Sequence, residues 1–220
     1  MDHLKPDPVK PVPRPNSLQD PLDVLVEGTA GPQPGRRLFH AANGLLIWAI
    51  LRFSGIETGT AIVALSVLCA FALAGDLARL RDPRLNRLFF QTFSYFASPR
   101  ERRGIASSTW YLAGIVAALL LFPRPFAEAG ILVLALADPA ASWFGRRYGR
   151  KRFGTGSLLG SAVFWLVAAG VLWPLAGAGP AIAAATVGAL AEALPWRIDD
   201  NVSVPLATAA ALTLSSALLG

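Results

Sequence analysis

The residues best suited to chemistry lie in one short stretch, where an aspartate interrupts an apolar run and cations follow it. Asp138 is followed by Arg146, Arg147, Arg150, Lys151 and Arg152. A carboxylate at membrane depth is costly and marks a functional site by default, while Gly145 and Gly149 let backbone approach a ligand beside the cations. The stretch predicts a site for phosphate and metal. Cations after an apolar segment can also simply fix membrane orientation, and that alternative stays open.

A second acidic group stands near the C-terminus, at Asp199-Asp200-Asn201. Carboxylate and amide oxygens are the hard ligands that Mg²⁺ takes together with substrate phosphates, so Asp138, Asp199 and Asp200 are the predicted metal ligands. The triplet could equally be the N-cap of the helix that starts near Val202. Pro139 disfavours helical backbone at Asp138 and removes a donor, so we expect the helix to break there.

Further polar groups stand at helix ends that we expect to face the same side. The group comprises Arg36, Arg37, His40, Asp76, Arg79, Arg100, Glu101 and Glu192. Two of these have plain structural alternatives: His40 can be a hydrogen-bonded packing residue, and Glu101 can belong to an exposed mixture of charges. Between them, residues 88–96 are aromatic-rich and predict an amphipathic interfacial helix, which either admits a lipid or only lies on the surface.

The elements that must position these residues are membrane helices. The chain of 220 residues is 54% hydrophobic and only 15% charged, with a mean hydropathy of +0.48, which excludes an ordinary soluble domain. Seven apolar runs approach membrane-spanning length, at 38–56, 59–75, 107–122, 126–144, 158–175, 180–194 and 202–219. We therefore predict an all-α, multi-pass integral membrane protein of about seven transmembrane helices, some of them broken or short.

Charge gives the expected orientation. Eighteen of the 20 Lys and Arg residues fall in segments that share one side if the N-terminus is cytosolic, leaving only Arg52 and Arg124 outside. This distribution explains the net charge of +6 as a membrane signal and excludes nucleic acid as the partner. Residues 1–35 hold eight of the 17 prolines and predict a disordered cytosolic tail ahead of a membrane domain over 36–220.

Signatures of soluble enzymes are absent from the sequence. It has no phosphate-binding G-x-x-x-x-G-K-[ST] loop, no G-x-G-x-x-G, no H-E-x-x-H and no C-x-x-C. The lone Cys69 forms neither an intramolecular disulfide nor a metal cluster. A nucleotide would have to be held by machinery built on the membrane helices, in a cavity that faces the cytosol.

The motifs together resemble the CTP-dependent lipid kinase family, which includes dolichol kinase, phytol kinase and yeast-type diacylglycerol kinase. The resemblance covers about residues 36–210. It is carried by Arg36-Arg37-Leu-Phe-His40, Gly75-Asp-Leu-Ala-Arg79 with Asn86, Pro99-Arg-Glu101 with 108–114, Asp138-Pro-Ala-Ala with 145–149, 157–161, and Glu192-Ala-Leu-Pro with 199–205. Two of these runs, 76–86 and 100–114, look closest to the diacylglycerol kinase branch.

The resemblance implies transfer of the γ-phosphate of CTP to a lipid alcohol, with Mg²⁺ bridging the phosphates. The implied catalytic residues are Asp138, Asp200, His40 and Glu101. The residues implied to bind nucleotide are Arg36, Arg37, Arg79, Arg100, Gly145, Arg146, Arg147, Gly149, Lys151, Arg152, Ser157, Ser161 and Asn201. The implied partners are the nucleotide, a lipid alcohol (diacylglycerol, a polyprenol or a phytol-like alcohol) and the bilayer.

One departure from the family pattern bears on activity. Where the family commonly has a Lys-Ser pair followed by an acidic residue or alanine, this chain has Gly156-Ser157 and then Leu159. Loss of that cation would weaken nucleotide binding unless Lys151 or Arg152 takes its place. Two alternatives therefore stay open: a phosphatidate cytidylyltransferase (CDP-diacylglycerol synthase), which also uses CTP, and a non-catalytic lipid-binding relative.

Overall fold

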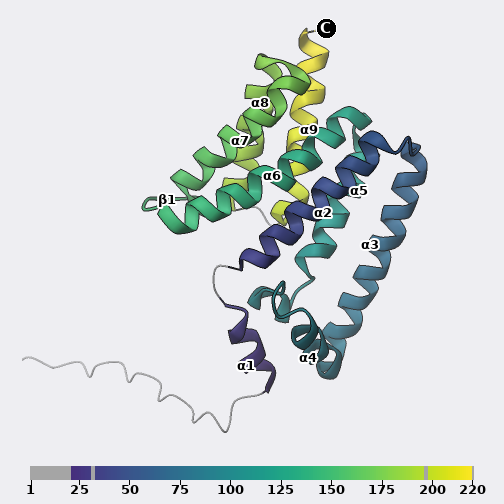
Figure 1. Ribbon diagram of the computed structural model, residues 1–220, viewed down its shortest axis with the longest axis vertical. Coiled ribbons are helices and arrows are strands. Elements are labelled where there is room, and N and C mark those ends of the chain that lie inside the picture. The colour runs from purple at the N-terminus through teal and green to yellow at the C-terminus, as the bar shows by residue number, and fades with distance from the viewer. Residues whose placement is uncertain (1–20, 31–32, 196–197, 220) are drawn as a thin grey trace, which may run out of the picture.

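The computed structural model describes residues 21–30, 33–195 and 198–219, and in them the fold is all-α (Figure 1). The helices are α1 (Pro21–Gly28), α2 (Pro34–Phe53), α3 (Thr58–Arg81), α4 (Pro83–Thr92), the 3₁₀ helix η2 (Pro99–Arg102), α5 (Ser107–Leu121), α6 (Arg124–Tyr148), α7 (Leu158–Ala176), α8 (Ala178–Ala193) and α9 (Asp200–Leu219). Between α6 and α7, strands β1 (Arg152–Phe153) and β2 (Gly156–Ser157) form an antiparallel hairpin.

Each of the seven predicted apolar runs forms a helix, from α2 and α3 through α5 to α9. Four of them, α3, α6, α7 and α9, are long and apolar enough to cross a membrane, whereas α5 and α8 are apolar but shorter. The prediction of an all-α membrane protein is therefore confirmed at the level of helical class and of four candidate spans. Short helices were also expected, and α5 and α8 have 15 and 16 residues.

The predicted helix break at Asp138-Pro139 is wrong. The structure has one uninterrupted helix of 25 residues, α6, with Pro139 inside it, and α7 and α9 likewise continue through Pro174 and Pro205. A proline removes one backbone hydrogen bond, which an apolar helix can tolerate when neighbouring helices hold it in place. Helix α6 is packed in this way, because it lies against α2, α7 and α9 and is buried along most of its length.

The core of the bundle is built around α6, and small residues let its neighbours approach. Ile131, Val133 and Ala135 are fully buried there. A Cβ at Gly130 would lie 2.6 Å from the Pro205 carbonyl oxygen on α9, and one at Gly114 on α5 would lie 2.1 Å from that of Asn201. Only glycine fits at such backbone contacts, so these two positions bring the start of α9 against both α5 and α6.

Helix α3 lies at the edge of the bundle, beside α5 and with α4 at its foot (Figure 1). Most of its side chains are exposed, including Val63, Val67 and Phe71 at 50% or more. An apolar helix that leaves so much surface uncovered is suited to contact lipid rather than water.

The predicted disorder of residues 1–35 is wrong for residues 21–28, which form helix α1. Leu22 and Val26, one turn apart, are buried against Phe90 and Ala97, and Asp23 forms an ion pair with Arg102. This spacing places both apolar side chains on one face, so docking stabilises a helix too short to form alone. The rest of the predicted tail that precedes residue 21 lies outside the described residues, as do residues 31–32 and Arg197.

Candidate active site

A polar cavity of about 610 Å³ opens where the ends of α2, α6, α7, α8 and α9 meet. Of the residues predicted from sequence, the cavity is lined by Arg36, Arg37, His40, Arg100, Asp138, Gly145, Arg146, Gly149, Arg152, Ser157, Asp199, Asp200 and Asn201. These residues come from segments up to 165 positions apart (36 to 201), so the tertiary fold brings most of the predicted site into one place.

Arginines are the commonest charged residues in the cavity wall. Arg36 and Arg37 come from the first turn of α2, Arg100 from η2, and Arg146 from the last turn of α6. Repulsion among these guanidinium groups weakens where an anion lies between them, and each group can hydrogen-bond a phosphate in a bidentate manner. The cavity is therefore suited to a polyanionic ligand.

Asp138 faces these cations from the middle of α6. It is partly buried and interacts electrostatically with Arg36, Arg37 and Arg146, which attract its charge, and with Asp199, which repels it. Asp200 in turn interacts with Asp138 and Asp199. The carboxylates and the guanidinium groups therefore share one electrostatic environment, which a triphosphate with a divalent cation would complement.

Asp199 also has the structural role that sequence analysis left open for the triplet. Its side-chain oxygen accepts hydrogen bonds from the Asn201 backbone N–H and side-chain amide, at 3.1 and 2.6 Å, and its carbonyl accepts from Val202 and Ser203. Asp199 thus caps α9, as Asp and Asn commonly do. Asp200 follows in the first helical turn, where the helix dipole favours negative charge.

The acidic residues do not form a protein-only metal site. Across the described residues, no group of three or more His, Cys, Asp or Glu side chains is arranged to hold a metal ion. Mg²⁺ usually takes one or two carboxylates and completes its shell with waters and substrate phosphates. Asp138 and Asp200, lining one cavity with the arginines, fit that kind of shared site.

Glycines and Ser157 fasten the hairpin and the start of α7 to the end of α6. The Ser157 hydroxyl accepts from the Gly160 N–H at 3.1 Å and donates to the Gly145 carbonyl at 3.3 Å. A Cβ at Gly149 would lie 2.3 Å from that hydroxyl oxygen. Ser157 therefore caps α7 and is engaged by protein, whereas the glycines shape the cavity wall by their lack of side chains.

Three predicted nucleotide-binding residues lie elsewhere on the surface or behind the wall. Arg147 is exposed and stacks on Tyr148, with 5.7 Å between its guanidinium carbon and the ring centroid, and Lys151 is also exposed. Neither lines the cavity. Ser161 is buried and donates to Glu192 at 3.4 Å.

Glu192, Arg150 and Gln33 also line the cavity, although none of them was among the residues predicted to be catalytic or to bind nucleotide or metal. Glu192 lies in the last turn of α8 and interacts electrostatically with Asp138. The sequence could have indicated both Glu192 and Arg150 as cavity residues. Glu192 stands near the end of an apolar run, shortly before Pro195, and Arg150 belongs to the basic stretch that follows Asp138. Gln33 carries no such signal; it stands just before α2 and donates to the Ala97 carbonyl at 3.1 Å.

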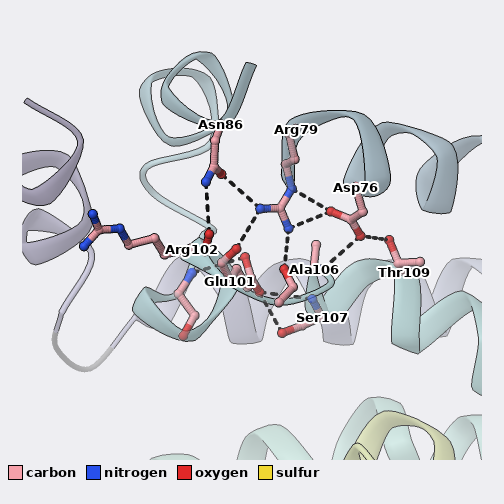
Figure 2. A network of polar contacts seen from close by, with 10 residues as sticks. Asp76, Arg79, Asn86, Glu101, Arg102, Ala106, Ser107 and Thr109 are labelled. Carbon is pink, nitrogen blue, oxygen red and sulfur yellow. Dashed lines mark hydrogen bonds and ion pairs between the residues drawn. The ribbon is translucent and has the colours of Figure 1, made fainter. Parts of the chain in front are cut away.

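Arg79 lies outside the polar cavity, at the centre of a buried network (Figure 2). Its guanidinium group pairs with Asp76 at 2.6 Å and donates to the Asn86 side chain and to the carbonyls of Glu101 and Gly104. Asp76 completes the network by accepting from Thr109 at 2.7 Å. Together these contacts join α3 to α4, to the segment that precedes α5 and to α5 itself, so the geometry gives Arg79 a structural role.

Glu101 is likewise buried rather than part of an exposed charge mixture, so that alternative is wrong. Its carboxylate accepts from the backbone N–H of Ser98 and from both the N–H and the hydroxyl of Ser107. The Ser107 hydroxyl in turn accepts from Arg36 at 2.6 Å. Glu101 therefore does not line the polar cavity, in contrast to what was predicted for a catalytic residue. It is connected to the cavity indirectly, by hydrogen bonds to Ser107 and from Arg36 to Ser107.

A second cavity, of about 650 Å³, lies between α2, α3, α4 and the start of α5. Its lining is mainly apolar and includes Phe39, Leu85, Leu88, Phe89, Phe93 and Phe96. Arg36 and His40 line both cavities. His40 also lies against Tyr111, with 5.0 Å between ring centroids, and thus combines a packing role with a place at the boundary.

Three curated proteins are similar to this chain, and each is named CTP-dependent diacylglycerol kinase 1. The protein of Schizosaccharomyces pombe is 26% identical over 81% of this chain and 91% of its own length. Those of Eremothecium gossypii and Saccharomyces cerevisiae are 29% and 26% identical over 52% and 63% of this chain, which spans only 36% and 48% of their lengths. No family model and no solved structure matches. The chain is thus similar in sequence to proteins named as CTP-dependent diacylglycerol kinases, the branch of lipid kinases that residues 76–86 and 100–114 resemble.

Proposed function

We propose that this protein is an integral membrane kinase that transfers the γ-phosphate of CTP to the hydroxyl of a lipid alcohol, with diacylglycerol as the acceptor. One observation carries the proposal: arginines from α2, η2 and α6 converge with Asp138 and Asp200 on one cavity. The names of the sequence relatives supply the donor and the acceptor class.

The proposed chemistry asks mainly for positioning and charge neutralisation. In phosphoryl transfer the protein orients donor and acceptor and stabilises charge on the transferred group. Arg36, Arg37 and Arg146, which all line the cavity, would bind the phosphates. Asp138 would orient the acceptor hydroxyl or hold the metal, and His40 stands at the boundary where a proton would leave that hydroxyl.

Mg²⁺ fits the proposed site as a cofactor shared with the nucleotide. Asp138 and Asp200 would hold it, and Asp199 would contribute electrostatically while it caps α9. When bound, the ion would neutralise phosphate charge.

The proposed membrane arrangement has seven spans, from α2 to α9 without α4, with the N-terminus and the polar cavity on the cytosolic side. The cavity residues support it: they stand at the starts of α2, α7 and α9 and at the ends of α6 and α8, which alternate as successive spans require. Residues 36–220 would form this membrane domain and residues 1–35 its cytosolic extension. Its partners would be nucleotide, lipid alcohol and bilayer, and not nucleic acid.

The proposal is tested with purified protein in mixed micelles, given CTP labelled either on the γ-phosphate or on the cytidine. Diacylglycerol, a polyprenol and phytol are compared as acceptors, and ATP as donor. We expect the γ-phosphate label to enter diacylglycerol. Entry of the cytidine label into phosphatidate would instead identify a cytidylyltransferase, and lipid binding without consumption of either nucleotide would identify a non-catalytic relative.

Gly156, which stands where the resembled family commonly has a lysine, gives a separate prediction. It lines the polar cavity beside Glu192. A Cβ there would lie 3.8 Å from the Glu192 carboxylate, which is ordinary contact, so a side chain fits. Gly156→Lys adds a cation near Arg150 and Arg152 and should lower the KM for CTP about five-fold, the equivalent of about 1 kcal/mol for one partly solvated charged contact. Gly156→Met is the matched control without charge, and an equal effect of both variants would contradict the explanation.

A further inference from the structure

We infer that the apolar cavity between α2, α3 and α4 binds the acyl chains of diacylglycerol and presents its hydroxyl to the polar cavity. The inference rests on the proposed function and assigns the lipid to a site. The two cavities, of about 650 and 610 Å³, differ in character: the first is lined mainly by aromatic and aliphatic side chains and the second by charges. Both fall within the usual size of ligand pockets.

The apolar lining comes from elements that lie at the edge of the bundle. Leu85, Leu88 and Phe93 on and after α4 are 42%, 56% and 48% exposed although they are large and apolar. The adjoining α3 exposes Phe71 at 74%. Acyl chains that fill the cavity can thus continue along the uncovered side of α3, and their burial would remove this apolar surface from water.

The buried charged residues in the cavity wall do not oppose an apolar ligand, because their hydrogen bonds are already made within the protein. Asp76, Arg79 and Glu101 line the cavity and are all buried. The Arg79 guanidinium group pairs with Asp76, and the other hydrogen bonds of the three residues run to neutral side chains and backbone groups, as Figure 2 shows. A fully satisfied network costs nothing further when lipid covers it, whereas unpaired charges would exclude a chain.

The wall shared by the two cavities would bring the hydroxyl of diacylglycerol next to the γ-phosphate of CTP. Arg36 and His40 line both, and Arg36 is held in place by its hydrogen bond to Ser107. Behind His40, the buried Tyr111 hydroxyl has no hydrogen-bond partner among the described residues. A lipid whose chains occupy the apolar cavity would place its hydroxyl at this wall, facing the arginines that would hold the phosphates.

Gly75 allows the cavity to be filled without disturbing the protein. It lines the cavity from α3, and a Cβ there would meet no atom within 4 Å. Gly75→Leu should therefore raise the KM for diacylglycerol at least ten-fold and leave the KM for CTP unchanged. The matched control is Gly170→Leu on α7, where a Cβ also meets nothing and which lines neither cavity. Equal KM values for diacylglycerol in the two variants would overturn the inference.

A binding experiment keeps this test independent of catalysis. Purified protein is labelled by light with a diacylglycerol that carries a diazirine on one acyl chain, and the labelled residues are located by mass spectrometry. We expect labelling over residues 85–96 that excess unlabelled diacylglycerol prevents, that Gly75→Leu abolishes and that Gly170→Leu retains. If this pattern appears in a protein without kinase activity, the proposed function fails and the lipid site stands.

Two other outcomes of the labelling experiment count against the site. Labelling spread over the exposed apolar helices without competition would overturn it, because that pattern describes bulk lipid contact. Competition by phytol or a polyprenol but not by diacylglycerol would overturn the assignment of the occupant.

Discussion

Asp138→Asn is expected to reduce transfer of the γ-phosphate of CTP to diacylglycerol by on the order of 10³-fold, as loss of one preorganised charged group does at comparable sites. The replacement keeps the size of the side chain and removes only its charge and one acceptor oxygen. In the structure that charge interacts electrostatically with Arg36, Arg37, Arg146 and Asp199. No other carboxylate on α6 reaches the cavity within the described residues.

The effect should fall on kcat rather than on CTP binding. Removing a negative charge from among the arginines leaves them more available to phosphates, so the KM for CTP should stay the same or decrease. The assay is initial-rate transfer of γ-label at saturating diacylglycerol. A rise in KM with unchanged kcat would contradict the proposed role, because it would make Asp138 a binding residue only.

Asp82→Asn is the matched control for this experiment. Asp82 lies outside both cavities and caps α4 by accepting from the Arg84 N–H at 2.8 Å. Asn is an equally good N-cap, so this variant should retain full activity and stability. A comparable loss of activity in both variants would point to a general effect of charge removal.

Arg79→Lys is expected to destabilise the protein by about 3 kcal/mol, because it dismantles the buried network around Asp76. The guanidinium group contacts Asp76, Asn86 and two backbone carbonyls at once. A lysine ammonium is a single point of charge and cannot span these partners, so several buried acceptors lose their donor. The readout is the midpoint of thermal unfolding in detergent, which should decrease by several degrees.

The result for Arg79 separates a structural role from nucleotide binding, which the resemblance to the family implied. If Arg79 has only a structural role, Arg79→Lys lowers the unfolding midpoint, and the variant protein that stays folded has an unchanged KM for CTP. A raised KM for CTP at unchanged unfolding midpoint would restore the nucleotide-binding interpretation. Arg81→Lys, on the same helix and exposed, is the control and should alter neither quantity.

Much of the site could be anticipated from sequence because a charged side chain in or beside a membrane helix is costly where it contacts lipid. Asp138 and the arginines at 146 and 36–37 follow or interrupt apolar runs, and polar groups in such positions gather where water and ligand are available. The same runs predicted the helices, since only hydrogen-bonded secondary structure is stable in a bilayer. Membership of one cavity then followed from the alternation of helix directions.

Other features depended on contacts between segments that no local pattern encodes. Arg79 and Glu101 have the residue types of ligand-binding groups, but packing of α4 and η2 against α3 buries both in a network. Pro139 favours a break, yet α6 packs against α2, α7 and α9 and stays one continuous helix. Helix α1 gains its stability only from the docking of Leu22 and Val26.

The sequence by itself determined the all-helical class, the apolar segments that are candidates to span a membrane and the charged residues available for phosphate. The tertiary structure alone decided which of those charges share a cavity and which are paired with each other, and it placed an apolar cavity beside the polar one. The physical reason is range: helix formation depends on backbone hydrogen bonds within four residues, whereas the pairing or freedom of a charge depends on side chains far away along the chain.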